Sequence, residues 1–439
     1  MSGGIVKPIN IGICGLGTVG VGVFTVLDRN CQEISARTGR ALKVTHVSVR
    51  NNKPQLDYDG ITVVDDVLTI ANDPEVDIVV ELIGGCELAK KLVLQSIENG
   101  KQVVTANKAL IALHGNEIFK AAAEKQVAVH YEASVAGGIP IIKAMREGLT
   151  ANRIQWLAGI INGTGNYILT EMRDHGRDFD QALADAQQLG YAEADPSFDV
   201  DGIDACHKLV ILASLAFGIP LQFDKAMTEG IRDIERQDVV YAEELGYRIK
   251  HLGIAKRTDS GIELRVHPTL VPESQLLAKV DGVMNAILVN ADAVGQSLYY
   301  GPGAGAEPTA SAVIADIIDI ARVMGAPYQS QVPALAFHPD TMKIEPVVNA
   351  DETVSAFYLR MQVDDELGVM TKITQQLALH GINIEAMIQK EPLSNESTVP
   401  LVILTSPVKY ALVAAAIKEI ASFEKVSDKI TQIRLDALA

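Results

Sequence analysis

The sequence predicts an α/β protein made of three parts: a parallel-sheet domain, an α+β domain, and a small domain at the C-terminal end. Three observations lead to this prediction. Short apolar runs alternate with helical patterns over residues 8–150, longer helices mixed with strands occupy 151–325, and residues 351–439 follow the order strand, helix, strand, strand, helix, strand. The first pattern is typical of βαβ units, and the last is that of a βαββαβ, ferredoxin-like fold.

Composition limits the organisation and the partners of the chain. Its 439 residues exceed what one core usually holds, which agrees with two or three domains. A content of 48% hydrophobic and 21% charged residues is typical of a folded, globular protein. The net charge of −17 argues against nucleic acid or an anionic membrane as a partner, so an anionic ligand must be held locally by backbone amides and a few basic side chains.

Cysteine usage and hydropathy indicate the compartment. The four cysteines form no C-x-x-C motif and no disulfide-like framework, the N-terminal segment lacks the apolar core of a signal peptide, and no apolar run approaches the length of a membrane span. We therefore expect a soluble protein of the reducing cytoplasm without a membrane partner.

The first domain, residues 1–150, is expected to contain five parallel strands with helices between them. Helical patterns occupy 21–30 and 89–100, and Gly100 is a typical residue to end the second of these helices. The expected strands are 9–14, 42–49, 77–83, 102–107 and 127–133.

A glycine-rich turn follows the first strand. Gly15, Gly17 and Gly20 have the G-x-G-x-x-G spacing between that strand and the first helix. Gly15 permits the tight turn, Gly17 lets the backbone approach a pyrophosphate, and Gly20 lets helix and strand pack closely, while the helix N-terminus faces the phosphates. The spacing alone is a weak signal, but between a strand and a helix it predicts a Rossmann-type dinucleotide site.

The end of the second strand bears on which dinucleotide binds. An NAD site usually has Asp or Glu there for the ribose 2′-hydroxyl, whereas an Arg can accept the 2′-phosphate of NADP. Here Arg50 follows the strand, Lys53 is close by, and the first carboxylate is Asp57. Arg50 is either an ordinary solvated side chain or a phosphate ligand. We favour NADP over NAD, because charge-assisted hydrogen bonds to phosphate are strong.

Residues 151–325 form the expected second domain, with strands at 261–271 and 286–292. A glycine-rich turn then leads into a helix within 306–325, which we expect to pack back on the first domain and for which Thr309 is the expected N-cap. The stretch 326–350 is rich in proline and polar residues and is expected to be a linker. We therefore expect 351–439 to be a separable module, so that a chain ending near residue 345 remains catalytically competent.

A lysine at the start of an apolar helix raises the question of function. Asp204 and Lys208 stand four residues apart, on one helix face, before the uniformly apolar or small run 209–217. An ammonium group that enters a protein interior must be paired or lose its proton. The two residues are either a common helix-surface salt bridge or part of a functional site.

Two other polar patches favour function. Thr105, Asn107 and Lys108 follow a strand at the carboxyl edge of the predicted sheet, where such sheets bind ligands. A group of carboxylates precedes Lys208, and it is either a solvated acidic loop or the binding site of a substrate ammonium group. These are Glu193, Asp195, Asp199, Asp201 and Asp204.

These motifs resemble those of homoserine dehydrogenases, and the resemblance covers nearly all of residues 8–325. The segments that carry it are "GICGLGTVG", "TANK", "YEASVAGGIP", "GTGNYIL", "GYAEADPSFDVDGIDACHKL" and "YYGPGAGAEPTASAVIADI". The resemblance implies the interconversion of L-aspartate 4-semialdehyde and L-homoserine with NAD(P)H, on the path to threonine and methionine. No aspartokinase-like region accompanies it.

The resemblance also implies residue roles. Lys208 is the catalytic residue, which donates a proton to the oxygen that becomes negative as hydride reaches the aldehyde carbon and accepts one in reverse. The substrate lies among Glu193, Asp204 and Lys108. Further cofactor contacts fall on Thr18, Val19, Thr105, Gly190 and Gly303. A monovalent cation, usually sodium, is held by a carboxylate and backbone oxygens, which are hard ligands for a hard cation; the loop that matches consists of Glu132, Val135, Gly137 and Ile139.

The C-terminal segment "MQVDDELGVMTKITQQLALHGINIEAM" resembles an ACT regulatory domain. This implies an amino-acid effector, with threonine as the first expectation, bound between paired domains near "DDELGV" and "HGINI". Leu367 precedes the turn glycine Gly368, where a proline is common, so the turn departs from the usual pattern. We expect a homodimer or homotetramer.

Two other interpretations stay open at this point. One is a different Rossmann reductase of amino-acid metabolism, against which the "GYAEADP…DACHKL" segment argues. The other is a non-catalytic NADP-sensing regulator in which Lys208 is only part of a structural pair.

Overall fold

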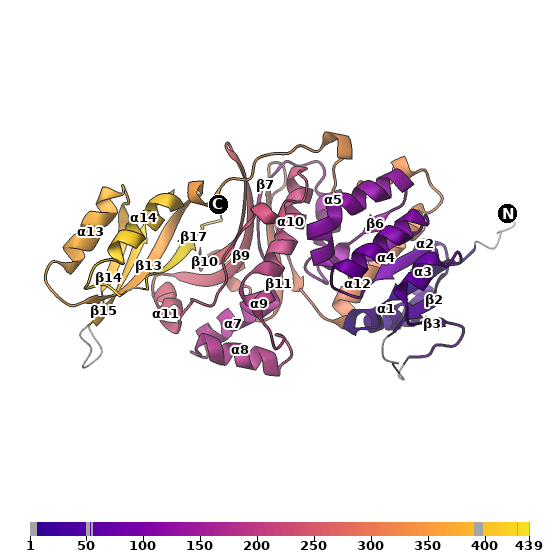
Figure 1. Ribbon diagram of the computed structural model, residues 1–439, viewed down its shortest axis with the longest axis horizontal. Coiled ribbons are helices and arrows are strands. Elements are labelled where there is room, and N and C mark those ends of the chain that lie inside the picture. The colour runs from indigo at the N-terminus through magenta and orange to yellow at the C-terminus, as the bar shows by residue number, and fades with distance from the viewer. Residues whose placement is uncertain (1–6, 50–52, 54–55, 390–397, 428, 439) are drawn as a thin grey trace. The chain divides into compact units, whose positions relative to one another are not determined.

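The computed structural model (Figure 1) describes residues 7–49, 53, 56–389, 398–427 and 429–438. Its internal contacts divide the chain into two compact units. The first unit consists of residues 1–157, 206–224 and 284–345, and the second of 158–205, 225–283 and 346–439. The boundaries fall within a strand and a helix, so this division differs from the predicted series of three domains. In the described part of the chain, no helix is long and apolar enough to cross a membrane.

The first unit contains the parallel sheet and its helices. Its strands are β1 (Ile9–Cys14), β2 (Leu42–Ser48), β3 (Thr62–Val64), β4 (Ile78–Glu81), β5 (Gln102–Thr105), β6 (Val129–His130), β11 (Met284–Ala291), β12 (Gly295–Pro302) and the start of β7 (Ile154–Ile160). Its helices are α1 (Thr18–Arg29), α2 (Cys31–Thr38), α3 (Val67–Asn72), α4 (Glu87–Glu98), α5 (Lys108–Lys125), α6 (Ile141–Lys143), α12 (Ala306–Val323) and most of α10 (Ile203–Phe217).

The strand order of this sheet confirms the predicted class. The six strands run β3-β2-β1-β4-β5-β6, and each neighbouring pair is parallel. This is the strand order of the doubly wound dinucleotide-binding fold, in which ligands bind where the order reverses, beside the first strand. That strand, β1, begins and ends at the predicted residues.

The other strands differ from the prediction, and β2 and β5 end one and two residues before the predicted ends. β4 ends at Glu81 rather than at Ile83, because the Glu81 carboxylate accepts a hydrogen bond from the Ile83 amide at 2.9 Å. β6 is much shorter than 127–133, because the chain turns and the Glu132 amide donates to the Asp316 carboxylate at 2.7 Å. The short β3 was not predicted, since exposed and half-buried residues give it little apolar pattern.

Helix α12 packs against α1 (Figure 1). A Cβ atom at Gly22 of α1 would lie 2.5 Å from the Ala306 carbonyl oxygen, so only a glycine allows this approach. The predicted N-cap, Thr309, is wrong, because α12 starts at Ala306 with Gly305 as its N-cap. Gly305 has a φ of 124°, which glycine adopts readily and which lets the chain enter the helix earlier.

The second unit combines helices with an antiparallel-rich sheet. Its helices are α7 (Gly163–Asp174), α8 (Phe179–Gln188), α9 (Ser197–Val200), α11 (Arg236–Glu244), α13 (Val369–Leu379), α14 (Tyr410–Ile420) and the start of α10. Its strands are β8 (Met227–Thr228), β9 (Tyr247–Thr258), β10 (Gly261–Pro272), β13 (Val354–Asp364), β14 (Ile384–Gln389), β15 (Thr398–Thr405), β16 (Val408–Lys409) and β17 (Thr431–Leu435).

The βαββαβ order predicted for the C-terminal segment is present in the structure. Its strands lie in the order β17-β13-β15-β14, and α13 and α14 cover one face of them (Figure 1). Alternate residues of β13, Phe357, Leu359 and Met361, join this helix-covered core.

The packing of this segment argues against the expected separability, because its sheet is buried on both faces and continues into its neighbour. β17 pairs in parallel with β10, with Thr269 opposite Arg434. Tyr358, on the other face of β13, shares a core with α7, α8, α11 and β9. A chain ending near residue 345 would expose this core, and it would lose the strand that pairs with β10.

An ionic cluster adds to the same contact. Asp238 of α11 has no exposed surface, and its carboxylate accepts hydrogen bonds from the Tyr358 hydroxyl at 2.9 Å and from Arg360 Nε at 2.6 Å. Arg360 also pairs with Glu235 at 2.9 Å. A buried charge of this kind requires its partner, so β13 and α11 depend on each other.

Candidate active site

The turn between β1 and α1 requires its glycines. Gly15 has a φ of 100°, and a Cβ atom there would lie 2.7 Å from the Leu82 carbonyl oxygen. A Cβ atom at Gly20 would lie 2.1 Å from the Gly15 carbonyl oxygen. These approaches bring the start of α1 directly against the sheet, as the spacing of the motif requires.

The start of α1 is open. A Cβ atom at Gly17, its N-cap, would meet no heavy atom within 4 Å, and Gly17 provides no capping side chain. Gly17 and Thr18 are exposed, and Val19 is half-buried. The first amides of a helix carry a partial positive charge, so this terminus suits an anionic group.

A pocket of about 300 Å³ lies beside this turn, and its lining includes Gly15, Gly17, Ser48 and Lys53. Ser48, which ends β2, is buried, and its Oγ accepts a hydrogen bond from the Gly15 amide at 3.1 Å. β2 therefore ends in a hydroxyl and not in the carboxylate typical of an NAD site. Asp65 and Asp66 also line the pocket, and Arg50 lies outside the described residues.

The carboxyl ends of β4 and β5 are joined by a buried acid that sequence reasoning missed. Glu81 has no exposed surface, and it accepts a hydrogen bond from the Thr105 hydroxyl at 2.5 Å. Burial raises the pKa of Glu81, and the hydrogen bonds it accepts oppose the rise. The Thr105 hydroxyl also accepts the Asn107 amide at 3.0 Å, and Asn107 caps α5, whose first residue is Lys108. A glutamate at the end of an apolar strand was the available signal.

The predicted cation loop contains a buried carboxyl group. Glu132 is only 3% exposed, and its carboxylate accepts hydrogen bonds from the Ile142 and Lys143 amides at 2.9 and 2.7 Å. Burial raises the pKa of Glu132 to about 8, and the Asp316 carboxylate adds to the rise. The described residues hold no group of three His, Cys, Asp or Glu side chains suited to a metal. A cation at this loop would favour ionised Glu132 and would need backbone oxygens, so these residues fit a monovalent cation better than a transition metal.

The structure brings this loop next to another predicted residue. Gly137 has a φ of 48°, and a Cβ atom there would lie 2.5 Å from the Gly303 carbonyl oxygen. Val135 and Ile139, on either side of it, are buried. Gly303 lies against Asn285, which is 1% exposed and whose side-chain amide has no hydrogen-bond partner among the described residues. A bound ligand is one way to satisfy such a group.

Helix α10 carries the predicted lysine. Asp204 lies in its first turn and Lys208 one turn later, and they are 3% and 8% exposed. Residues 209–217 are buried throughout, as predicted. The burial of both charged groups removes the interpretation as an exposed surface pair, because such pairs lie in solvent.

The acidic residues before Lys208 occupy different environments. Asp201 pairs with Arg232 at 2.5 Å, and Asp195 accepts the Ser197 amide at 3.1 Å, so both have structural partners. Glu193 is exposed, and it follows Gly190, which has a φ of 76°. Glu193 and Gly190 belong to the second unit, whereas the glycine turn, Lys108 and the Glu132 loop belong to the first.

Comparison with known proteins agrees with these motifs. The family model "Homoserine dehydrogenase, NAD binding domain" matches residues 15–132, and "Homoserine dehydrogenase" matches residues 140–318. A homoserine dehydrogenase of Pseudomonas aeruginosa is 57% identical over 432 residues, which cover 98% of this chain and 100% of that protein. The chain belongs to the homoserine dehydrogenase family.

Solved structures of the family have the same fold. The crystal structure of a homoserine dehydrogenase from Thiobacillus denitrificans has a TM-score of 0.94 and 56% identity, and the alignment covers 99% of each chain. A homoserine dehydrogenase of S. aureus at pH 7.5 has a TM-score of 0.76 and 30% identity over 98% of this chain and 99% of its own. A hyperthermophilic archaeal homoserine dehydrogenase in complex with NADPH has a TM-score of 0.62 and 26% identity over 71% and 97%.

Proposed function

We propose that the chain is an NAD(P)H-dependent homoserine dehydrogenase that interconverts L-aspartate 4-semialdehyde and L-homoserine in the cytoplasm. The observation that carries this proposal is the buried Asp204–x₃–Lys208 arrangement on α10, within a sequence that belongs to this family over nearly its whole length. The reaction serves the synthesis of threonine and methionine.

In the proposed mechanism the chain manages the proton. When bound, the reduced nicotinamide supplies the hydride to the aldehyde carbon. Lys208 donates a proton from its ammonium group to the oxygen on which negative charge develops, and in the oxidation of homoserine it removes the hydroxyl proton. Asp204, Glu193 and Lys108 bind and orient the substrate, with a carboxylate for its ammonium group.

For the cofactor, we propose NADP in preference to NAD. The support is the hydroxyl of Ser48 in place of a carboxylate at the end of β2, Lys53 in the lining of the same pocket, and Arg50 in the following segment. The residues proposed to contact the cofactor are Gly15, Gly17, Thr18, Val19, Gly20, Arg50, Thr105, Lys108, Gly190 and Gly303. The proposed cation site, probed with sodium, consists of Glu132, Val135, Gly137 and Ile139.

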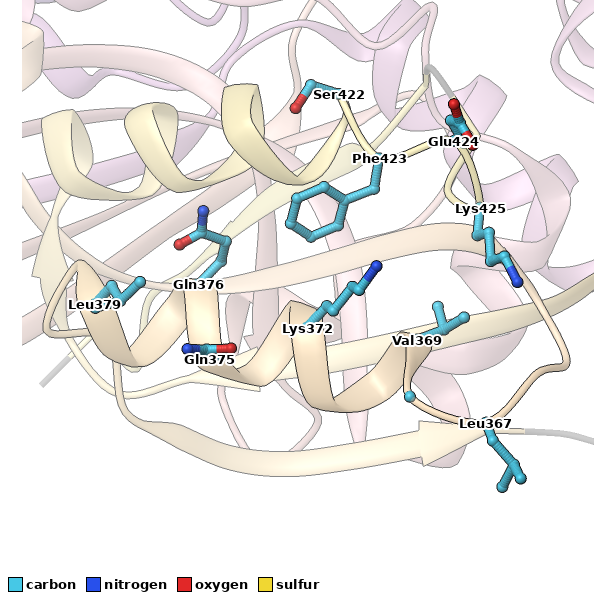
Figure 2. A pocket seen from close by; sticks show the side chains of 11 residues that line it. Leu367, Val369, Lys372, Gln375, Gln376, Leu379, Ser422, Phe423, Glu424 and Lys425 are labelled. Atoms are coloured by element: carbon cyan, nitrogen blue, oxygen red, sulfur yellow. The ribbon is translucent and has the colours of Figure 1, made fainter.

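For the C-terminal domain, we propose the role of an ACT-type receptor for an amino acid, with threonine as the first ligand to test. A pocket of about 570 Å³ lies between α13 and the turn after α14, and its lining includes Gly368 and Val369 of the "DDELGV" loop (Figure 2). Lys372 points from α13 toward Phe423 across this pocket (Figure 2).

For the assembly, we propose a homodimer or homotetramer, which sedimentation would test.

One assay separates the proposal from its alternatives. The purified chain should oxidise NADPH when L-aspartate 4-semialdehyde is supplied, and Lys208→Ala should abolish this turnover without preventing NADPH binding. NADPH binding without turnover by the wild-type chain would instead indicate a nucleotide-sensing regulator. Turnover of other aldehydes or imines but not of the semialdehyde would indicate a different reductase.

A further inference from the structure

A single side chain joins two of the acids in the second unit. Asn162, which is 5% exposed, donates a hydrogen bond from Nδ2 to Asp199 Oδ1 at 2.7 Å and another to Asp204 Oδ2 at 2.8 Å. An amide nitrogen of Asn carries two hydrogens, so each carboxylate takes one. The two acids come from different segments, Asp199 from α9 and Asp204 from α10, and Asn162 connects them.

The third bond of Asn162 fixes the orientation of its amide. Asn162 is the N-cap of α7, and its Oδ1 accepts a hydrogen bond from the Gly165 amide at 2.7 Å. Because an amide N–H can only donate, the oxygen of Asn162 must face Gly165 and its nitrogen must face the acids. A side chain held at three points cannot rotate without losing at least one of these bonds.

The ring of His251 lies close to the starts of α7 and α10, where Asn162 and Asp204 lie. His251 of β9 is buried, and its Nε2 lies 2.9 Å from the Glu229 carbonyl oxygen. Cβ atoms at Gly165 and Gly202 would lie 3.6 and 3.2 Å from the His251 ring. Among the titratable groups, Asp199 shares the Asn162 amide with Asp204, His251 from β9 interacts electrostatically with Asp204, and Lys208 follows one turn later on the same helix.

The arrangement concentrates negative charge. Two carboxylates that accept hydrogen bonds from one amide nitrogen lie close enough to repel each other, and the neutral amide orients them. A cationic ligand lowers the energy of such a pair, so the amine of an amino-acid substrate is the matching chemistry.

We propose that Asn162 is a positioning residue that holds Asp199 and Asp204 as a pair toward the amine of the substrate. This inference rests on the proposed dehydrogenase function, because that function supplies the amine. Asn162 itself acts only through the two acids and through the start of α7.

The test is Asn162→Ser in the full-length chain. Serine is also a good N-cap, so it retains an acceptor for the Gly165 amide, but it loses the two-hydrogen donor. We expect kcat/KM for the semialdehyde to fall about 10- to 100-fold, the size of a lost hydrogen bond to a charged group. We also expect the acid limb of the kcat/KM–pH profile to move to higher pH, because loss of a donor destabilises the ionised carboxylate. The Kd of NADPH should not change.

Two further variants make the result decisive. Asp178→Ser is the control, because it changes the N-cap of the next helix, α8. The capping box of Asp178 is formed with Gln181 and not with Asp199 or Asp204, so this variant should leave the kinetics unchanged. Asn162→Asp retains the cap but replaces both donors with a third acid, so it should lose at least as much kcat/KM as the serine variant. Unchanged kinetics and an unmoved acid limb in Asn162→Ser would overturn the inference. Unfolding of both Asn162 variants would also overturn it, because both keep the cap, and their unfolding would show that the bonds to the two acids serve the fold. A wild-type chain without semialdehyde turnover would refute the proposed function instead.

Discussion

Substitution Asp238→Ala should destabilise α11 and β13 together. It removes a buried carboxylate that accepts from Arg360 Nε at 2.6 Å, from Arg360 Nη2 at 3.1 Å and from the Tyr358 hydroxyl at 2.9 Å. The Arg360 side chain is 6% exposed, so the guanidinium stays buried and retains Glu235, at 2.9 Å, as its acidic partner. Breaking a buried ion pair from one side costs about 3–5 kcal/mol.

This loss is large relative to the total. A domain is typically stable by about 5–15 kcal/mol, so the variant should unfold the contact between α11 and β13 in a measurable fraction of molecules. Native-state hydrogen exchange is the suitable measurement, because it reports the free energy of opening for each element separately. The amides of both elements should lose about 3–5 kcal/mol of protection.

A surface pair provides the control. Glu352 and Lys409 form an ion pair at 2.6 Å with side chains 59% and 51% exposed, so Glu352→Ala should cost less than about 1 kcal/mol. Weakened protection in β13 with α11 unchanged would refute the reasoning, because it would show that the C-terminal domain opens on its own. A loss below about 1 kcal/mol in both elements would show that the cluster does not hold them together.

Four other outcomes follow from the structure and the proposed function. Lys208→Ala should lower kcat by about 10²- to 10⁴-fold with an unchanged Kd for NADPH; near-wild-type kcat would return Lys208 to a structural pair. Arg50→Ala should raise KM for NADPH far more than for NADH, by roughly 1.5–3 kcal/mol, and equal effects would exclude a contact to the 2′-phosphate. A chain ending at residue 345 should be poorly soluble or should expose its second unit to proteases; a soluble, active product would contradict the shared core. Burial holds the pKa of His267 well below its usual value, so unfolding takes up a proton below about pH 6.5 and stability falls there by up to about 1.4 kcal/mol per pH unit. His267→Gln should flatten this slope in chemical unfolding, and an unchanged slope would show that other groups cause it.

The sequence predicted the parallel sheet well because local signals and tertiary demands coincide there. β1 is an apolar run that ends at a glycine turn, and Gly15 and Gly20 have no room for a side chain. Such positions are visible in a sequence, since only one residue type satisfies them. The apolar helix α10 was predictable for a similar reason, because a run of apolar or small residues from 209 to 217 is typical of a helix buried on all sides.

The missed features depend on contacts between distant segments. Glu81 bonds with Thr105, and Asn162 joins acids 37 and 42 residues further along the chain. No local pattern distinguishes such a buried polar residue from one in a solvated turn. The same limit applies to the C-terminal domain. Along β13, Tyr358 and Arg360 alternate with Phe357 and Leu359 as if they faced solvent, yet their face packs on α11.

This burial of both sheet faces bears on how an effector could act. A ligand changes activity only if it binds one conformation of the chain better than another. The pocket at α13 and the Asn162 cap of α7 belong to the same compact unit, and α7, α11 and the outer face of β13 share one core. A shift of β13 must therefore either repack that core or break the Asp238 cluster, whereas a flexibly tethered domain would transmit nothing. Effector control through this domain should then be lost in Asp238→Asn, which keeps an acceptor for Tyr358 but removes the charge that holds Arg360, while turnover without effector persists. Undiminished threonine inhibition in that variant would place the coupling outside the contact between β13 and α11.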